Sequence, residues 1–333
     1  MKKRVLTYLA LALLLSCTRI EVQDWEPQSL VAYNVVSSTA AQTKATTAFP
    51  TTSTFMSSAY QLNSDQSWDS NYASSNLKFG PEEVKYMGTY WSTDDKHFWE
   101  DGKTLTFFSY APASLSSLGL TISKEGVSVD DWDVTDDSKK DKLILVADVA
   151  KDKVKNESFA GFTGVPTHFR HKLCKVSIRL AKSTFSEADE KIYVTKLSIG
   201  SYFTKADFKK GGTDAESWTN LRNKVTETVL YEAATGEPLS SDAFWVLDNV
   251  MIPQTLTADS YLTISYKSVK KSGETSYEGP VTLYFMRDFR SGIWAIGTHV
   301  TYTLKVGVGM FPIQFEASAD AWTQEGTTGI EIL

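Results

Sequence analysis

Hydrophobic and polar residues alternate along many short stretches of the chain. The clearest stretch has apolar residues at every second position: Val300, Tyr302, Leu304, Val306 and Val308. A period of two indicates a strand with one face in a core and the other in water, as in antiparallel sheets. The same alternation puts Cys174 on one face with Val176, Ile178 and Leu180. The pattern therefore predicts two strands and places Cys174 in a core.

Further alternating stretches occur throughout the chain. Leu262, Ile264 and Tyr266 precede a polar turn at 270–274, which is followed by Val281, Leu283 and Phe285; this arrangement predicts a hairpin. Shorter strands are predicted around Leu105 and Phe107, around Val127 and Val129, and over 143–149. Helical periodicity is confined to Ser183–Lys191 and Ala215–Lys224, so we expect a few short helices.

Many short strands with few helices are typical of β-sandwich domains. The chain has 333 residues, more than one typical domain, which favours two domains. A loop rich in Lys, Asn, Gly and Pro over 151–167 precedes the strong strand at Cys174. We therefore predict an all-β protein with an N-terminal domain over 18–166 and a C-terminal domain over 167–333.

The first seventeen residues differ from the rest of the chain. Lys2, Lys3 and Arg4 precede an apolar run over 5–15, about half of the roughly 20 residues that a membrane-spanning helix needs. The run is typical of a secretory signal over 1–17. Leu14-Leu15-Ser16-Cys17 resembles the lipobox of bacterial lipoproteins, which implies lipidation of Cys17. The alternative is an ordinary secretory signal in which Cys17 has no role.

Composition and charge exclude several functions. The formal net charge of -6 gives no basic surface for nucleic acid. Two cysteines, Cys17 and Cys174, are too few for a disulfide framework or a structural zinc cluster. The sequence has no phosphate-binding loop, dinucleotide fingerprint, zinc-protease motif or nucleophile elbow. We therefore expect no catalytic residue, metal or cofactor, although carboxylate pairs for glycoside hydrolysis are set by the fold and stay open.

Three groups of polar residues have candidate chemistry. The acidic stretch from Asp130 to Asp141 lacks the glycine and closing glutamate of a calcium loop, and we expect a solvated loop there. His168 and His171 fall on opposite faces of a strand, which is wrong for one metal ion. A catalytic Cys174 would need an exposed, electropositive site, whereas its alternation predicts burial.

Aromatic residues concentrate between 90 and 110. The group comprises Tyr90, Trp91, Phe98, Trp99, Phe107, Phe108 and Tyr110. Aromatic side chains pack well on half-buried sheets, which favours a core role. The alternative is an exposed platform on which sugar rings stack.

Several segments, taken in order, resemble Bacteroidales-type fimbrillins. They are the lipobox at Cys17, the stretch 98–112, Leu145-Val146-Ala147 with Val165-Pro166 and the stretch 169–173, and the closing strands from Trp294 to Leu304 with Ala321-Trp322. The resemblance implies two tandem transthyretin-like β-sandwich domains and assembly into fimbriae.

The resemblance also implies a route of assembly. In that family a lipidated precursor reaches the outer membrane, and a trypsin-like protease removes the first strand by cutting after a basic residue. Lys44 fits this position, and the removed strand would be Ser29–Val36; stalk subunits of the family typically have arginine at the cut. The alternative is that Lys44 is only a solvated linker residue. The C-terminal segment Ile313–Leu333 would then donate a strand to another subunit, with Ile313, Phe315, Ile330 and Ile332 as its apolar residues.

Two functions follow from these observations. The first is a structural subunit, in the stalk or at the tip, of an adhesive cell-surface fimbrium. Its partners would be other fimbrial subunits, the outer membrane through the precursor's lipid, and a glycan or protein receptor on a host or another bacterium. The alternative is a monomeric, glycan-binding surface lipoprotein.

Overall fold

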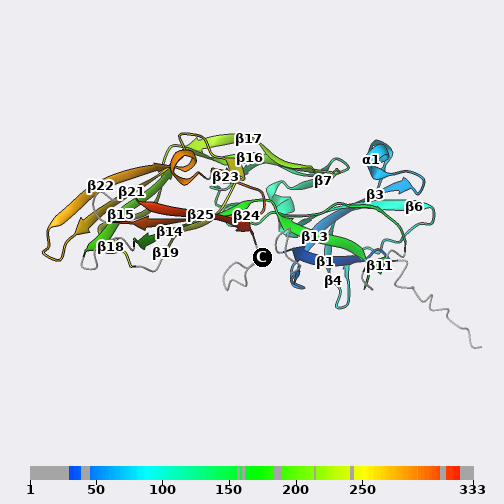
Figure 1. Ribbon diagram of the computed structural model, residues 1–333. Coiled ribbons are helices and arrows are strands. Elements are labelled where there is room, and N and C mark those ends of the chain that lie inside the picture. Colours follow the sequence, from blue (N-terminus) through cyan, green and yellow to red (C-terminus); the bar gives the residue numbers. More distant parts are fainter. Residues whose placement is uncertain are drawn as a thin grey trace, which may run out of the picture.

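The structure is a computed structural model, and it describes residues 30–38, 46–155, 158–159, 162–183, 190–213, 215–240, 244–290, 292–307 and 313–322. The molecule is elongated and consists of two β-rich lobes joined end to end (Figure 1). The N-terminal lobe lies on the right of that view and the C-terminal lobe on the left. The predicted all-β class is confirmed.

The N-terminal lobe is built on one nine-stranded sheet. Its strands, in spatial order, are β10 (Ala150–Lys153), β6 (Lys103–Ala111), β3 (Phe55–Asn63), β4 (Asn76–Tyr86), β5 (Trp91–Thr93), β1 (Tyr33–Ser38), β13 (Val165–His171) and β9 (Leu145–Ala147). The ninth strand, β2 (Thr46–Ala48), pairs with β1. Strand β9 also pairs with β6, at Val146 opposite Tyr110. The sheet from β6 to β9 therefore closes on itself, which removes its open edges.

The C-terminal lobe contains two four-stranded sheets. One has the order β19 (Phe244–Met251), β14 (Cys174–Lys182), β24 (Thr298–Val306) and β25 (Gln314–Ala321). The other has the order β18 (Thr228–Pro238), β15 (Lys191–Gly200), β21 (Tyr261–Val269) and β22 (Thr275–Tyr284). A single hydrophobic cluster, drawn from residues 174–313, includes apolar side chains of both sheets, as in a β-sandwich.

A further four-stranded sheet joins the two halves of the chain. It consists of β17 (Glu216–Val225), β16 (Tyr202–Gly211), β8 (Gly126–Asp133) and β7 (Thr121–Ser123). Its central pair, β8 and β16, brings together strands from either side of the predicted boundary at Pro166. A hydrophobic cluster beside it likewise contains residues from both halves, among them Trp132, Phe208 and Trp322.

Pro166 itself lies inside β13, which is hydrogen-bonded to β1 and β9 of the N-terminal sheet. The division into 18–166 and 167–333 stays a prediction. Because the N-terminal cluster reaches Phe169 and the C-terminal cluster starts at Cys174, we propose a boundary between those two residues.

The remaining elements are short. They are the helix α1 (Trp68–Asn71), 3₁₀ turns at Tyr72–Ser74 and Ala113–Leu118, a π-helical turn at Phe285–Phe289, and the strand pairs β11 (Ser158–Phe159) with β12 (Phe162–Thr163) and β20 (Gln254–Thr255) with β23 (Ile293–Trp294). No helix in the described ranges is long and apolar enough to span a membrane.

The strongest alternating patterns correspond to strands. In β24 the buried positions are Val300, Tyr302, Leu304 and Val306, as predicted; Val308 lies outside the described residues. Strands β21 and β22 form the predicted hairpin, with Leu262 opposite Leu283. Cys174 is fully buried, as its alternation indicated.

Two local predictions are wrong. The segment 215–224, predicted to be helical, forms the edge strand β17. Asn220 and Asn223 have φ values of 52° there. These left-handed residues interrupt the alternation of side chains between the two faces of the strand, so the sequence shows no period of two. The second is wrong only at its start: of the acidic stretch Asp130–Asp141, predicted to be a solvated loop, Asp130–Asp133 end strand β8, whereas Asp136, Asp137 and Asp141 lie in exposed turns as predicted. Ser183 is buried and Lys191 begins β15; the residues 184–189 of the other predicted helix lie outside the described residues.

Candidate functional site

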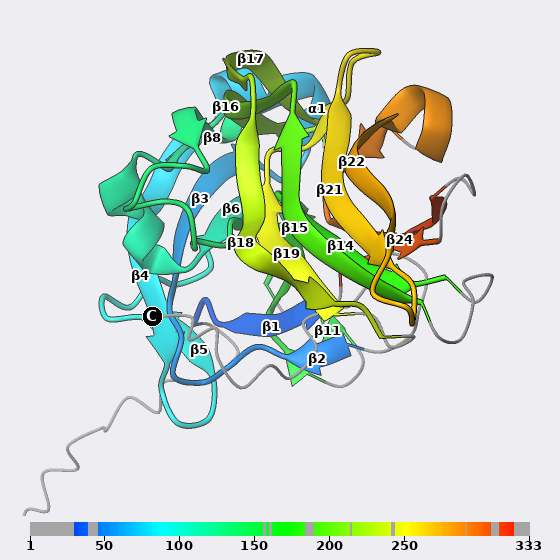
Figure 2. The ribbon, with the colours of Figure 1, turned by 90° about the vertical axis from the view of Figure 1, so that its left-hand side faces the viewer.

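Strand β1 has hydrogen-bonded neighbours on both sides. It runs parallel to β13, with Tyr33 opposite Val165, and the two strands lie side by side in Figure 1. On its other side β1 pairs antiparallel with β2, which Figure 2 shows just below it, and Tyr33 pairs with Trp91 of β5. Departure of β1 would leave unpaired backbone groups on both neighbours, a state that sheet proteins normally avoid.

Alternate side chains of this segment enter the core of the N-terminal lobe. Val31, Tyr33 and Val35 are 2%, 1% and 9% exposed. The ring of Tyr33 packs edge-to-face on Phe55 and Phe107, at centroid distances of 5.4 and 5.7 Å. Burial of one apolar or aromatic side chain contributes about 1.5 to 3 kcal/mol, so the three together contribute roughly 6 kcal/mol.

The Tyr33 hydroxyl has a polar partner inside this core. It donates to Ser57 Oγ at 3.1 Å, and Ser109 Oγ donates to the same oxygen at 2.9 Å. Burial, the main influence, raises the pKa of Tyr33 well above its usual value. The phenol is therefore neutral at any physiological pH and acts as a hydrogen-bond donor.

Backbone hydrogen bonds hold the segment before β1 as well. The amide of Val31 donates to the carbonyl of His97 at 2.8 Å, and the amide of Val165 donates to the carbonyl of Ala32 at 2.7 Å. Leu30 forms an isolated bridge with Phe98. The residues from Leu30 to Ser38 therefore form one continuous, paired segment, and most of the predicted removable strand Ser29–Val36 lies within it.

The predicted processing residues cannot be placed in this site. Cys17, Ser29 and Lys44 lie outside the described residues. In the sequence, Lys44 falls between the last residue of β1, Ser38, and the first residue of β2, Thr46. Lipidation at Cys17 and cleavage at Lys44 stay predictions.

The predicted donor residues fall into two groups. Ile313 is buried in the C-terminal core, and Phe315 belongs to β25, where it pairs with Leu304 of β24 in the same chain. Ile330 and Ile332 lie outside the described residues. Their role as a donor strand stays a prediction.

The described part of the chain ends on a well-packed residue. Trp322 is 7% exposed and stacks on His171, with ring centroids 4.1 Å apart and planes 11° from parallel. The Trp322 amide also donates to the carbonyl of Gly297 at 2.8 Å. These contacts hold the last described residue against His171 and Gly297.

The aromatic group between 90 and 110 is mainly core. Trp91, Phe107, Phe108 and Tyr110 are buried, and the other three members are partly buried. Phe107 points into the N-terminal cluster, while Phe108 belongs to the cluster shared by the two halves. The core interpretation is therefore confirmed for the buried members, and a sugar platform at this place has no support.

Charged groups outside this region form ion pairs. Arg222 pairs with Asp131 and, at 2.6 Å, with Asp207; the Arg222 guanidinium holds the pKa of Asp207 well below its usual range. His168 is half-buried and His171 buried, on opposite faces of β13 as predicted. Within the described ranges, no group of three or more His, Cys, Asp or Glu residues could hold a metal ion.

A buried ion pair lies where the two lobes meet. Lys172 is 1% exposed, and its Nζ is 2.6 Å from Glu216 Oε2. Burial lowers the pKa of Lys172, partly offset by the Glu216 carboxylate. Trp218 Nε1 donates to the carbonyl of Lys172 at 2.6 Å. Sequence reasoning missed this pair, together with Tyr33–Ser57 and Trp322–His171, because all three join residues far apart in the chain and no local pattern indicates them.

These features define a class of protein: an elongated, two-lobed β-structure whose first strand completes a closed sheet. The chain matches the family model described as "Fimbrillin-like" over residues 43–322, and it belongs to this family. A comparison with curated proteins finds no match.

Solved structures share the fold. A fimbrial protein from Bacteroides vulgatus superposes with a TM-score of 0.63 at 21% sequence identity, covering 89% of this chain and 100% of that one. A candidate cell adhesion protein from Bacteroides uniformis gives a TM-score of 0.51 at 17% identity, covering 88% and 99%. As a fimbrillin-like protein, the chain is a structural, non-enzymatic protein of the cell surface that associates with other fimbrial subunits.

Proposed function

We propose that this chain is a subunit of adhesive fimbriae that assembles by exchange of strand β1 after proteolysis of a lipoprotein precursor. One observation carries the proposal: β1 is a central strand of a closed sheet, yet it precedes every other described strand in the chain. A single cut after it therefore separates a core strand from the rest of the fold.

The cut predicted at Lys44 has the right position for this purpose. It falls between β1 and β2, so β1 would be released while β2 and all later strands stay on one chain. Loss of Val31, Tyr33 and Val35 would open the aromatic core around Phe55 and Phe107 to water. The exposed groove would have unpaired backbone groups on β13 as well as an apolar floor, and a strand of another subunit can satisfy both.

We assign the donor role within 313–333 to Ile330 and Ile332. Ile313 and Phe315 belong to segments already packed or paired in their own lobe. Ile330 and Ile332 are separated by the polar residue Glu331, so in a strand both isoleucines would face the same side. An inserted strand of the same polarity as β1 would run parallel to β13.

The precursor would reach the outer membrane with a lipid on Cys17. One acyl chain binds a membrane only weakly, and stable anchoring takes more than one. A multiply acylated Cys17 would hold the chain at the surface until a cut at Lys44 releases everything that follows it.

The test uses the chain from Thr18 onward, treated briefly with trypsin. The sample is run unboiled on a denaturing gel, and the products are sequenced from their amino termini. We expect a single early cut after Lys44 and a ladder of oligomers. The variant Lys44→Gln should give neither, whereas Lys78→Gln, which removes the next basic residue, should behave like the wild type.

Deletion of 323–333 separates cleavage from assembly. This variant should still be cut after Lys44, but it should stay monomeric because it has no donor. A chain that is cut and remains monomeric with its C-terminal segment intact would refute self-assembly by strand exchange.

A further inference from the structure

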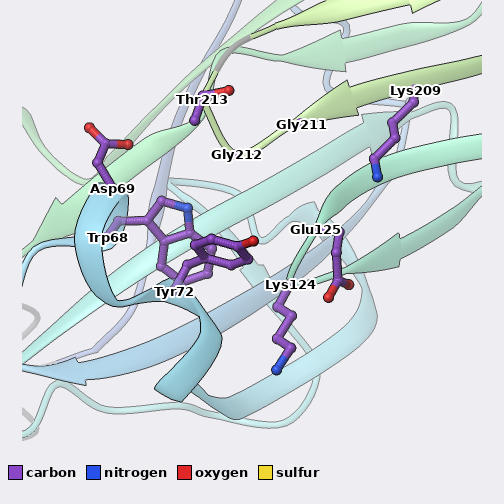
Figure 3. Close-up of a pocket in the computed structure, with 9 residues that line it drawn as sticks. All are labelled: Trp68, Asp69, Tyr72, Lys124, Glu125, Lys209, Gly211, Gly212 and Thr213. Carbon is purple, nitrogen blue, oxygen red and sulfur yellow. The ribbon is translucent and has the colours of Figure 1, made fainter.

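A hollow of about 210 Å³ lies on the N-terminal lobe between three separate segments. One wall is formed by α1 and the turn after it, with Trp68, Asp69 and Tyr72. The other walls come from the β7–β8 turn and the β16–β17 turn (Figure 3). Both ribbon views place α1 on the side of this lobe opposite to β1 (Figures 1 and 2). The hollow is therefore separate from the region where strand exchange is proposed.

The hollow has an aromatic wall that is held in place from behind. Trp68 is 1% exposed, its amide donates to Asp152 Oδ1 at 2.9 Å, and its ring packs on Phe108 at a centroid distance of 5.5 Å. Tyr72 lies against Trp68, with centroids 6.1 Å apart, and is itself 44% exposed. Tyr72 is thus a partly exposed aromatic ring that packs on a firmly held neighbour.

The facing turns bring polar groups close to this ring. Lys124 Nζ donates to the carbonyl of Ala73 at 3.0 Å, which ties the β7–β8 turn to the segment after α1. Glu125 accepts a hydrogen bond from Ser123 Oγ at 2.8 Å. On the β16–β17 turn, a side chain at Gly212 would come within 2.6 Å of Trp68 Nε1. The glycine therefore permits the close approach that forms the hollow.

A second hollow, of about 350 Å³, adjoins the first. The two share Glu125 and Lys209 in their walls. The second is lined by hydroxyl, amide and carboxylate side chains, including Ser128, Asp130 and Asn220. These groups offer both donors and acceptors at short spacing.

The charges around both hollows are balanced. Four carboxylates and two ammonium groups line them: Asp69, Glu125, Asp130, Asp207, Lys124 and Lys209. Asp69 also pairs with Lys151 at 2.8 Å and Asp207 with Arg222 at 2.6 Å, so no net charge is left to attract a phosphate or an acidic sugar. A neutral ligand with a flat apolar face and many hydroxyls matches both the exposed Tyr72 ring and the polar walls.

We propose that the hollow beside Tyr72 binds one pyranose ring of a neutral oligosaccharide, and that the next sugar unit occupies the adjoining hollow. Tyr72 stacks on the apolar face of the first ring, and Glu125 accepts hydrogen bonds from its hydroxyls. The site would serve adhesion by an assembled or unassembled subunit, and it depends on neither β1 nor the C-terminal segment.

The test measures binding of single sugars to the uncut chain from Thr18 onward. Methyl glycosides of glucose, galactose, mannose and N-acetylglucosamine are the neutral probes, and N-acetylneuraminic acid is the charged comparison. Saturation-transfer NMR and titration calorimetry give the Kd. A ligand with about 13 heavy atoms at ordinary efficiency reaches a Kd of about 1 mM, and we expect at least one neutral glycoside to do so.

Variants locate the site. Tyr72→Ala should weaken binding about tenfold or more, and Glu125→Gln about threefold. Tyr86→Ala is the matched control, because Tyr86 is similarly exposed, at 37%, but lies at the end of β4; it should leave the Kd unchanged. The substituted side chains are exposed, so circular dichroism and melting temperature should stay at wild-type values.

Three results would overturn the proposal. They are the absence of binding by all four neutral glycosides up to about twentyfold the expected Kd, full binding by Tyr72→Ala, and tighter binding of N-acetylneuraminic acid than of every neutral probe. Cleavage and assembly play no part in these measurements, so failure here leaves the proposed strand exchange untouched.

Discussion

Substitution of Tyr33 by alanine tests whether β1 belongs to the precursor fold and leaves it on assembly. Tyr33 is 1% exposed and lies at the centre of the N-terminal core, between Phe55 and Phe107. Its hydroxyl donates to Ser57. The substitution removes the ring from a packed site and leaves a cavity that the surrounding closed sheet cannot easily fill.

The expected loss follows from these contacts. Truncation of a large buried aromatic side chain to alanine lowers the free energy of unfolding by about 3 to 5 kcal/mol, and we take about 4 kcal/mol for Tyr33→Ala. Tyr33→Phe keeps the ring and removes one hydrogen bond, so it should lower the free energy by about 1 kcal/mol. Ser57 retains its bond from Ser109 in that variant, which limits the loss.

Urea unfolding of the uncut chain measures both effects. With a slope of about 2 kcal/mol per molar urea, the alanine variant should shift the midpoint of the N-terminal lobe by about 2 M. Tryptophan fluorescence of a chain with two lobes reports more than one transition, so the comparison uses the transition that responds to Tyr33. The phenylalanine variant is the matched control for ring packing.

The same measurement on the assembled form decides the mechanism. Position 33 lies on the fragment that a cut at Lys44 removes, so oligomers made from wild-type and Tyr33→Ala chains should have equal stability. A stability difference that persists in the oligomers would show that β1 has stayed in place. A change of less than 1 kcal/mol in the uncut chain would show that β1 is not an integral strand.

Three further predictions concern buried groups. Glu216→Gln leaves the Lys172 ammonium buried without its carboxylate, so it should lower the free energy of unfolding by about 3 kcal/mol, or roughly 9 °C in Tm. Lys172→Met removes the buried charge itself and should be nearly neutral. Equal losses of stability in the two variants would contradict the reasoning. Burial, aided by the charge of Lys172, lowers the pKa of His171 from 6.5 to about 4. As the pH falls, the unfolded chain therefore binds a proton at this histidine near pH 6.5, before the folded chain does. Stability should therefore fall by about 3 kcal/mol between pH 6.5 and 4, and His171→Phe, which keeps a ring against Trp322, should remove that share of the pH dependence. Burial also raises the pKa of the fully buried Cys174 thiol. Iodoacetamide should therefore leave Cys174 unmodified in the native chain from Thr18 onward and alkylate it in urea. Fast labelling of the native chain would show that the C-terminal lobe opens.

The parts of the fold that the sequence predicts best are strands with one buried face. In β24 the burial alternates almost regularly, and in β14 every second residue from Cys174 to Leu180 is buried, so the apolar positions show the strand and its inward side directly. The pairing of β14 with β24 is parallel and joins Lys175 to His299, a separation that no local pattern can indicate. Alternation therefore predicts strands, and only the tertiary fold determines most of their neighbours.

Edge strands and junctions are the parts that sequence reasoning misses. In β17 both faces are largely exposed, so no apolar stripe marks it, and its charged residues resemble the surface of a helix. The sheet that contains β17 also pairs β8 with β16, across the loop that composition marks as a boundary. A polar loop indicates where the chain is exposed, and it does not show whether strands on either side of it pair with each other.

The candidate site was predicted only in outline, because the family resemblance marks Ser29–Val36 as a strand but its alternation is imperfect: the residues between Val31, Tyr33 and Val35 are not all polar. The structure shows that Val31, Tyr33 and Val35 are the inward side chains. Ser57, which receives the Tyr33 hydrogen bond, gives no signal, since a serine in a strand is usually turned to solvent. Asp69 and Tyr72 likewise give no signal in the sequence, because they lie in a short polar stretch. Only the fold places them beside the β7–β8 and β16–β17 turns.

In the proposed mechanism, the position of the cut would control exchange of β1 more than the affinity of the donor does. While β1 is part of the chain, it competes for its groove at a high effective concentration, and a donor strand of similar affinity cannot displace it. Arg19 and Lys44 are the two basic residues between Cys17 and Lys78. A cut at Arg19 would leave β1 attached to β2, so the groove would stay filled. A cut at Lys44 would turn β1 into a separate peptide that dilutes away once it dissociates. For a protease that requires a basic residue, Lys44 is therefore the position before Lys78 at which cleavage opens the groove.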